Sequence, residues 1–126
     1  MGIRGFGASK EEAFEQAGLA LTAIIVDPKT LHDEIVIDIN CEAPDDELLF
    51  VDWLNALVYE MATQNLLFGR FEVRIDRGRL FGKAWGEKVE VTRHHPAVEV
   101  KGATYTALRV FQDEVGNWSA QCVVDV

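Results

Sequence analysis

The chain has 126 residues, of which 48% are hydrophobic, and its 12 basic and 21 acidic residues give a net charge of −9. A chain of this length buries roughly two-thirds of the surface that it exposes when unfolded, so it needs neither a metal nor a disulfide to fold. The negative charge argues against direct binding of nucleic acid, which uses clustered Lys and Arg, and it favours cations and basic protein surfaces as partners.

The first half of the chain predicts a short strand, a helix, a second strand and a second helix. A capping box begins at Ser9, and apolar residues at helical spacing continue from there to Ile25. Pro28 then stops the helix. Residues 34–41 alternate between apolar and polar side chains, which is typical of a strand with one face in solvent. The stretch Leu48–Gln64 is predicted to form a helix whose first half is buried.

The second half of the chain predicts strands. Residues 71–75 and 79–85 flank Asp76-Arg77-Gly78, a signal for a hairpin turn. Further strands are expected over residues 88–92, 97–101, 104–112 and 118–126, with a turn over residues 113–117. The order of elements indicates a single α+β domain over residues 1–126, in which two helices pack on a mostly antiparallel sheet.

The sequence carries no signal for secretion or for a membrane. Residues 1–7 lack the apolar segment of a signal peptide, and no apolar run approaches the length of about 18 residues that a membrane helix requires. We therefore expect a cytoplasmic protein without a membrane partner. Cys41 and Cys122 lie at apolar positions of alternating segments, so we predict buried free thiols, with a disulfide or redox pair as the alternative.

Polar residues at three places are candidates for chemistry, and each has a plainer interpretation. His94 and His95 would point to opposite faces of a strand, so we predict a solvated pair rather than two ligands of one metal ion. Asp52 interrupts an apolar run, and we interpret it as the exposed flank of a helix, with a polar network as the alternative. We interpret Lys101 as a charged residue at a strand edge, where Lys commonly hinders aggregation.

The carboxyl end of the chain is the sharpest candidate for a site. Asp125 precedes Val126, whose terminal carboxylate adds a second hard oxygen group. Two such groups could coordinate Ca²⁺, Mg²⁺ or Mn²⁺. Without a cation they repel each other, which favours a frayed end. The residues alone favour the frayed end over the metal site.

Several stretches, taken in order along the chain, resemble the archease family. They are Gly2–Gly7, Glu11–Phe14, Val51–Tyr59, Val100–Tyr105 and Val123–Val126. They run over essentially the whole chain, and the most specific are the helix with Trp-Leu-Asn and the end in Asp plus an aliphatic residue. The resemblance implies an archease-like fold. It also implies a protein cofactor rather than an enzyme, because archeases assist the RtcB-type RNA ligase.

That ligase joins RNA ends in tRNA splicing and repair, using GTP and a divalent metal. The resemblance implies that this protein promotes guanylylation and multiple turnover of the ligase, without direct contact with nucleic acid. The functional acid of the family falls on Asp125, and its terminal metal ligand falls on Val126. A divalent cation is therefore implied there, with Ca²⁺ expected and Mg²⁺ or Mn²⁺ as alternatives. The functional lysine falls on Lys101, which is expected to contact a phosphate or the ligase.

The sequence departs from the family pattern at two places. Archeases normally carry a His-Thr-Ala-Asp segment just before the position of Met1, and its Asp is the other metal-site carboxylate. With Asp125 and Val126 as the remaining ligands, we expect weak metal binding and a shortened first strand. Thr106 stands where the family often has His, so a titratable group is lost there.

Two other functions stay open at this point. A metal-dependent hydrolase would need a cleft with three or more ligands, and the sequence shows no such cluster. A chaperone-like module would bind other proteins through exposed apolar surface near Phe50 and Trp53. It would be recognised by its ability to suppress the aggregation of unrelated proteins.

Overall fold

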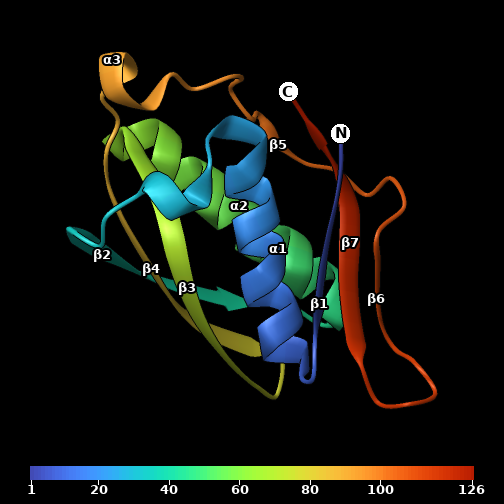
Figure 1. Ribbon diagram of the computed structural model, residues 1–126. Coiled ribbons are helices and arrows are strands. Elements are labelled where there is room, and N and C mark those ends of the chain that lie inside the picture. Colours follow the sequence, from blue (N-terminus) through green and yellow to red (C-terminus); the bar gives the residue numbers. More distant parts are fainter.

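A computed structural model describes residues 1–126 and contains helices and antiparallel sheets, which confirms the α+β class (Figure 1). The helices are α1 (Lys10–Ile25), α2 (Asp46–Gln64) and the single turn α3 (Val91–His94), with a 3-10 turn η1 at Pro28–Thr30. The strands are β1 (Gly2–Gly7), β2 (Ile35–Glu42), β3 (Leu66–Asp76), β4 (Arg79–Lys88), β5 (Gly102–Ala103), β6 (Arg109–Gln112) and β7 (Trp118–Asp125).

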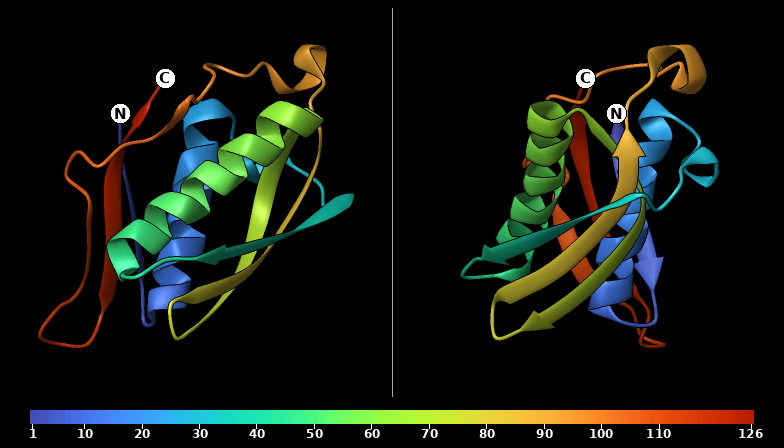
Figure 2. Two further views of the ribbon diagram at one scale, coloured as in Figure 1. Left: turned by 180° about the vertical axis from the view of Figure 1, so that it is seen from behind. Right: turned by 90° about the vertical axis from the view of Figure 1, so that its left-hand side faces the viewer.

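The strands form two separate antiparallel sheets, and α1 and α2 lie between them (Figure 1 and Figure 2). One sheet has the order β2-β4-β3. In the other, β7 pairs with β1 along one edge and with β6 and β5 along the other edge. The apolar core therefore fills the space around the two helices. These helices carry no apolar stretch of the length that a membrane crossing needs.

Helix α1 begins and ends where the sequence predicts. The Oγ atom of Ser9 accepts a hydrogen bond from the N–H of Glu12 at 3.1 Å. This is one of the two hydrogen bonds that define a capping box. Strand β1 crosses the helix at Gly5, where a Cβ atom would collide with the backbone of Ala13 and Ala17. Only glycine allows this approach, so the contact between β1 and α1 depends on it.

Helix α2 begins at Asp46, two residues before the predicted start, and it ends at Gln64 as predicted. Its first half is buried nearly all round, and Asp52 occupies an exposed flank, as predicted. Phe50 and Trp53 are both 0% exposed, and Nε1 of Trp53 donates to the carbonyl oxygen of Phe14 at 3.0 Å. They therefore provide no apolar surface of the kind that a chaperone-like function would use.

The hairpin between β3 and β4 has the predicted turn. Arg77 and Gly78 have φ values of 51° and 77°, which a tight two-residue hairpin turn requires. Cys122 is buried, Cys41 is half-buried, and both are free thiols. The prediction of buried free thiols is confirmed for Cys122 and only in part for Cys41, and the alternative of a disulfide between them is wrong.

The segment between β4 and β6 differs from the prediction. The strands expected over residues 88–92 and 97–101 are absent, and α3 and irregular chain take their place. The strand expected over residues 104–112 begins only at Arg109. The physical reason is visible in the backbone, because His95 and Ala107 have φ values of 49° and 55°. Residues in this left-handed region interrupt an extended chain.

Candidate functional site

The two ends of the chain lie side by side at one end of the molecule, next to β5 (Figure 1 and Figure 2). The amino group of Met1 donates to the carbonyl oxygen of Val124 at 3.0 Å, and the N–H of Val124 donates to the carbonyl oxygen of Met1 at 2.7 Å. Strand β7 continues through Asp125. The frayed end that the residues alone favoured is therefore wrong, because pairing on both edges holds the last strand.

Lys101 and Asp125 are brought together, although they lie far apart in the sequence. The backbone N–H of Lys101 donates to the carbonyl oxygen of Asp125 at 2.8 Å, and Gly102 is paired with Asp125 in the sheet. Both side chains are exposed, and Val126 is 48% exposed. This end of the molecule therefore presents the side chains of Lys101 and Asp125 and the terminal carboxylate, all open to solvent.

Helix α2 fixes the position of β5, the short strand that follows Lys101. The Oδ1 atom of Asn55 accepts the N–H of Ala103 at 2.8 Å. On the other side of the strand, Oγ1 of Thr104 donates to the carbonyl oxygen of Val123 at 2.8 Å. The Trp-Leu-Asn stretch of α2 thus combines a buried anchor, Trp53, with a side chain that reaches the candidate site.

The donor atoms at this end are oxygens, which hard divalent cations prefer, but they are too few to complete the coordination shell of such an ion. Asp125 and the carboxylate of Val126 supply oxygen ligands, whereas Ca²⁺ takes about 6–8 of them. The one group of three or more His, Cys, Asp or Glu side chains that lies close enough to hold an ion is elsewhere in the molecule. These two residues would fill only part of the coordination shell of a cation.

A second polar cluster surrounds Glu87, near the end of β4. This side chain is 1% exposed, and its Oε1 atom lies 2.6 Å from Nε2 of His94, whose ring is also 1% exposed. The prediction of a solvated histidine pair is therefore wrong for His94 and is confirmed for His95, which is exposed. The short helix α3 turns His94 back onto β4, which the assumed strand geometry did not allow.

The sequence held one signal for this cluster that was missed. Glu87 follows Ala84-Trp85-Gly86 in a strand whose alternate residues are buried, and a buried carboxylate requires hydrogen-bond partners. That requirement predicts nearby donors, although it does not identify them. In the structure the donors come from α3 and from the segment before β2.

Comparisons with known proteins agree with one another. The model of a family described as the Archease protein family matches residues 1–126. Protein archease of Pyrococcus furiosus is 40% identical over 130 residues, which cover 100% of this chain and 92% of that protein. Protein archease of Methanosarcina barkeri is 34% identical over 129 residues, which cover 98% of this chain and 88% of that protein.

A solved structure extends the likeness to the fold. The solution structure of protein 1598 of Methanobacterium thermoautotrophicum matches with a TM-score of 0.86 and 28% sequence identity. The match covers 99% of this chain and 91% of that chain. Sequence and fold are thus similar over nearly the whole length, including β5, β7 and the segment between them.

Proposed function

Because the chain belongs to the archease family, we propose that it acts as a protein cofactor of an RtcB-type RNA ligase in tRNA splicing and RNA repair. In this role it promotes the transfer of GMP from GTP to the ligase and so supports multiple turnover. The ligase performs the chemistry, and the cofactor acts by docking on it.

The observation that carries the proposal is that the backbones of Lys101 and Asp125 lie side by side. These are the two charged residues that the family resemblance singled out, and a backbone hydrogen bond of 2.8 Å joins them. The backbone and Asn55 hold this region, while the charged side chains stay exposed. A rigid frame with free charged groups is suited to contact with another protein.

The overall charge supports the same partner. A ligase that grips RNA offers basic surface, and a protein of net charge −9 is attracted to such a surface and repelled by RNA itself. The acidic cofactor can therefore dock on the ligase without binding the RNA directly.

Lys101 contacts a phosphate group or the ligase in this proposal. Asp125 and Val126 hold a divalent cation, with Ca²⁺ expected and Mg²⁺ or Mn²⁺ as alternatives. Two carboxylates alone bind such an ion weakly, because Ca²⁺ takes about 6–8 oxygen ligands. A cation bound there would reduce the repulsion between the carboxylates and an approaching phosphate.

The test is the formation of the covalent ligase–GMP adduct from labelled GTP. Wild-type protein is expected to stimulate adduct formation. Asp125→Asn and Lys101→Ala are each expected to reduce this stimulation about tenfold, which corresponds to ~1.4 kcal/mol for one lost charged contact. Glu114→Gln and Lys29→Ala are the matched controls, because both residues are exposed and lie outside the candidate site.

Circular dichroism melting curves should show that all four variants fold like the wild type, because every substituted side chain is exposed. If Asp125→Asn and Lys101→Ala stimulate the ligase as well as the controls do, the site assignment is wrong. If the wild-type protein does not stimulate an RtcB-type ligase, the proposed partner is wrong.

A further inference from the structure

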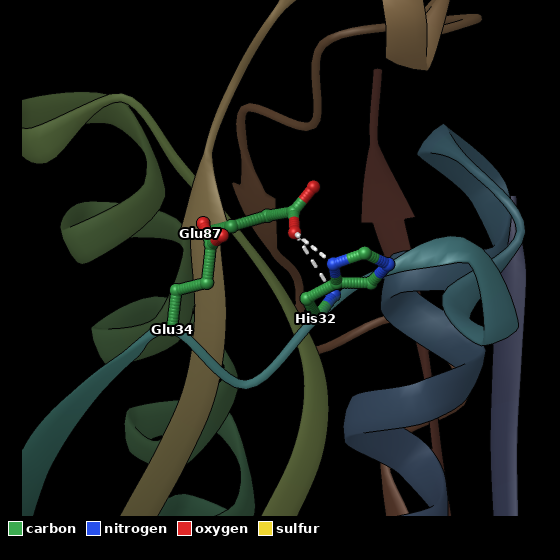
Figure 3. Close-up of side chains that lie close together, drawn as sticks. All are labelled: His32, Glu34 and Glu87. Carbon is green, nitrogen blue, oxygen red and sulfur yellow. Dashed lines mark hydrogen bonds and ion pairs between the residues drawn. The ribbon is translucent and has the colours of Figure 1, made fainter.

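The two oxygen atoms of the buried Glu87 carboxylate have different neighbours. Its Oε1 atom lies 2.6 Å from Nε2 of His94 and also contacts the guanidinium group of Arg93. Its Oε2 atom accepts the backbone N–H of His32 at 2.9 Å and lies 4.0 Å from Nδ1 of the same residue (Figure 3). The first oxygen is therefore enclosed by cationic and polar groups, whereas the second faces a side chain that can bind metals.

Glu34 completes a group of three donors with His32 and Glu87. One ligand atom each from His32, Glu34 and Glu87 can be chosen so that all three lie within 4.8 Å of one another. His32 and Glu34 are exposed, so the group is open to solvent on one side. Figure 3 shows that these two residues come from the segment before β2, whereas Glu87 comes from β4.

Backbone hydrogen bonds hold the two segments at this spacing. The N–H of Glu34 donates to the carbonyl oxygen of Gly86 at 3.0 Å, and the N–H of His32 donates to the side chain of Glu87. The donors therefore sit on a fixed frame, and only the two exposed side chains have to rotate to meet an ion. Such preorganisation is typical of a binding site.

The hydrogen bonds of His94 define its role as a support for Glu87. The Nδ1 atom of His94 accepts the backbone N–H of Glu90 at 2.8 Å, so the ring proton lies on Nε2 and is donated to Glu87. Both ring nitrogens are occupied, and the ring is not available as a ligand. A hydrogen-bond partner that orients a ligating carboxylate in this way is the usual second layer of a metal site.

The charges of the cluster do not balance within the chain. Glu34, Glu87 and Glu90 carry three negative charges, and Arg93 is the one permanently positive group among them, with its Nε atom 3.6 Å from Oε2 of Glu90. Two negative charges remain when the histidines are neutral. A divalent cation between His32, Glu34 and Glu87 would neutralise both.

We propose that His32, Glu34 and Glu87 form a binding site for a divalent transition-metal ion such as Zn²⁺. One imidazole and two carboxylates suit Zn²⁺ and its neighbours better than Ca²⁺ or Mg²⁺, which take oxygen ligands. Ligand atoms lie about 3.3 Å apart around a tetrahedral Zn²⁺ with bonds of about 2.0 Å, so His32 and Glu34 need to move only slightly. The fourth position is left to water.

The experiment uses the full, untagged chain and ZnCl₂ alone. Isothermal titration calorimetry should detect one Zn²⁺ per chain, and Zn²⁺ should raise the melting temperature. His32→Ala and Glu34→Gln should each weaken binding about tenfold or more. Both residues are exposed, so these variants are expected to fold. His95→Ala is the matched control, because it removes an exposed neighbouring histidine and should bind Zn²⁺ as the wild type does.

A second measurement identifies the ligand directly. In ¹⁵N spectra of the histidine rings, Zn²⁺ should shift the Nδ1 signal of His32 and leave His95 unchanged. Asp125→Asn should keep the response, which separates this site from the end of the chain and from the proposed action on the ligase. The proposal is overturned if the wild type binds no Zn²⁺, if His32→Ala binds it equally well, or if Asp125→Asn alone abolishes binding.

Discussion

At the scale of single residues, burial determines how reactive the two cysteines are. Desolvation raises the pKa of Cys41 to about 11, and the nearby charge of Asp52 acts in the same direction. Burial also raises the pKa of Cys122 to about 11, against a smaller opposing effect of a backbone hydrogen bond from Thr104. The thiolate is the reactive form of cysteine, so both thiols are protected in the folded protein.

We therefore expect both cysteines to resist alkylation by iodoacetamide at about pH 8. With a pKa of about 11, roughly one thousandth of each thiol is ionised at that pH, and alkylation should be about a hundredfold slower than in the unfolded chain. The rate should rise as the pH approaches 11. Mass spectrometry of samples taken over time, with and without guanidinium, measures this difference. Equal rates in the two conditions would contradict it.

Prediction of individual residues succeeded where a local pattern determines exposure. Asp52 lies on the polar flank of a buried helix, and helical spacing alone places it there. It failed for His94, because the ring is buried by a turn that brings it onto a strand seven positions earlier. No spacing rule encodes that contact. Lys101 and Asp125 were selected by family resemblance, and their proximity comes from a strand pairing that the sequence did not reveal.

At the scale of elements, β5 is held by few interactions and yet positions the candidate site. It contains two residues, pairs with the end of β7, and is joined to α2 through Asn55. A strand this short has little stability of its own. Its geometry, and with it the position of Lys101, therefore depends on the hydrogen bond between Asn55 and Ala103.

Asn55→Ala should loosen β5 without disturbing the core, because Asn55 is exposed. We expect a loss of about 1 kcal/mol in the free energy of unfolding and faster hydrogen exchange at the amide of Ala103. Asn55→Asp keeps an acceptor oxygen at the same place and is the matched control. Chemical denaturation and amide exchange followed by NMR measure the two effects. Unchanged exchange at Ala103 in Asn55→Ala would show that the bond does not hold the strand.

The elements that were predicted correctly carry local signals. Caps define both long helices, and a two-residue turn defines the β3–β4 hairpin. Residues 89–108 carry a conflicting signal, because valines at positions 89, 91, 98 and 100 favour strands. A strand needs a partner, and apart from Gly102–Ala103 this segment has none in the sheets. Tertiary context decided its structure, and the sequence alone did not reveal that context.

At the scale of the whole molecule, charge was predictable and the layering of the fold was not. The net charge of −9 follows from composition. The sequence predicted one sheet, whereas the strands divide into two sheets that enclose the helices (Figure 2). The number and length of strands do not determine which strands pair, because pairing depends on contacts between distant segments.

From the net charge of the protein we predict how its rate of association with the proposed partner depends on salt. Raising the ionic strength from about 0.05 M to about 0.5 M should slow association with the ligase about tenfold, because salt screens attraction between opposite charges. Dissociation should change much less. Stopped-flow fluorescence with a labelled ligase measures both rates. An association rate that is independent of salt would show that overall charge does not guide the encounter.

The pairing of β1 with β7 has a consequence for how the protein is made. Gly2 and Val123 are neighbours across this ladder, so β1 leaves the ribosome long before its partner β7 does. Until β7 has been made, it cannot pack on β1 or on the adjoining face of α1. Contacts between residues so distant in sequence form slowly, and an unpaired strand edge is prone to aggregation. The newly made chain is therefore more prone to aggregation before β7 has been synthesised than after it.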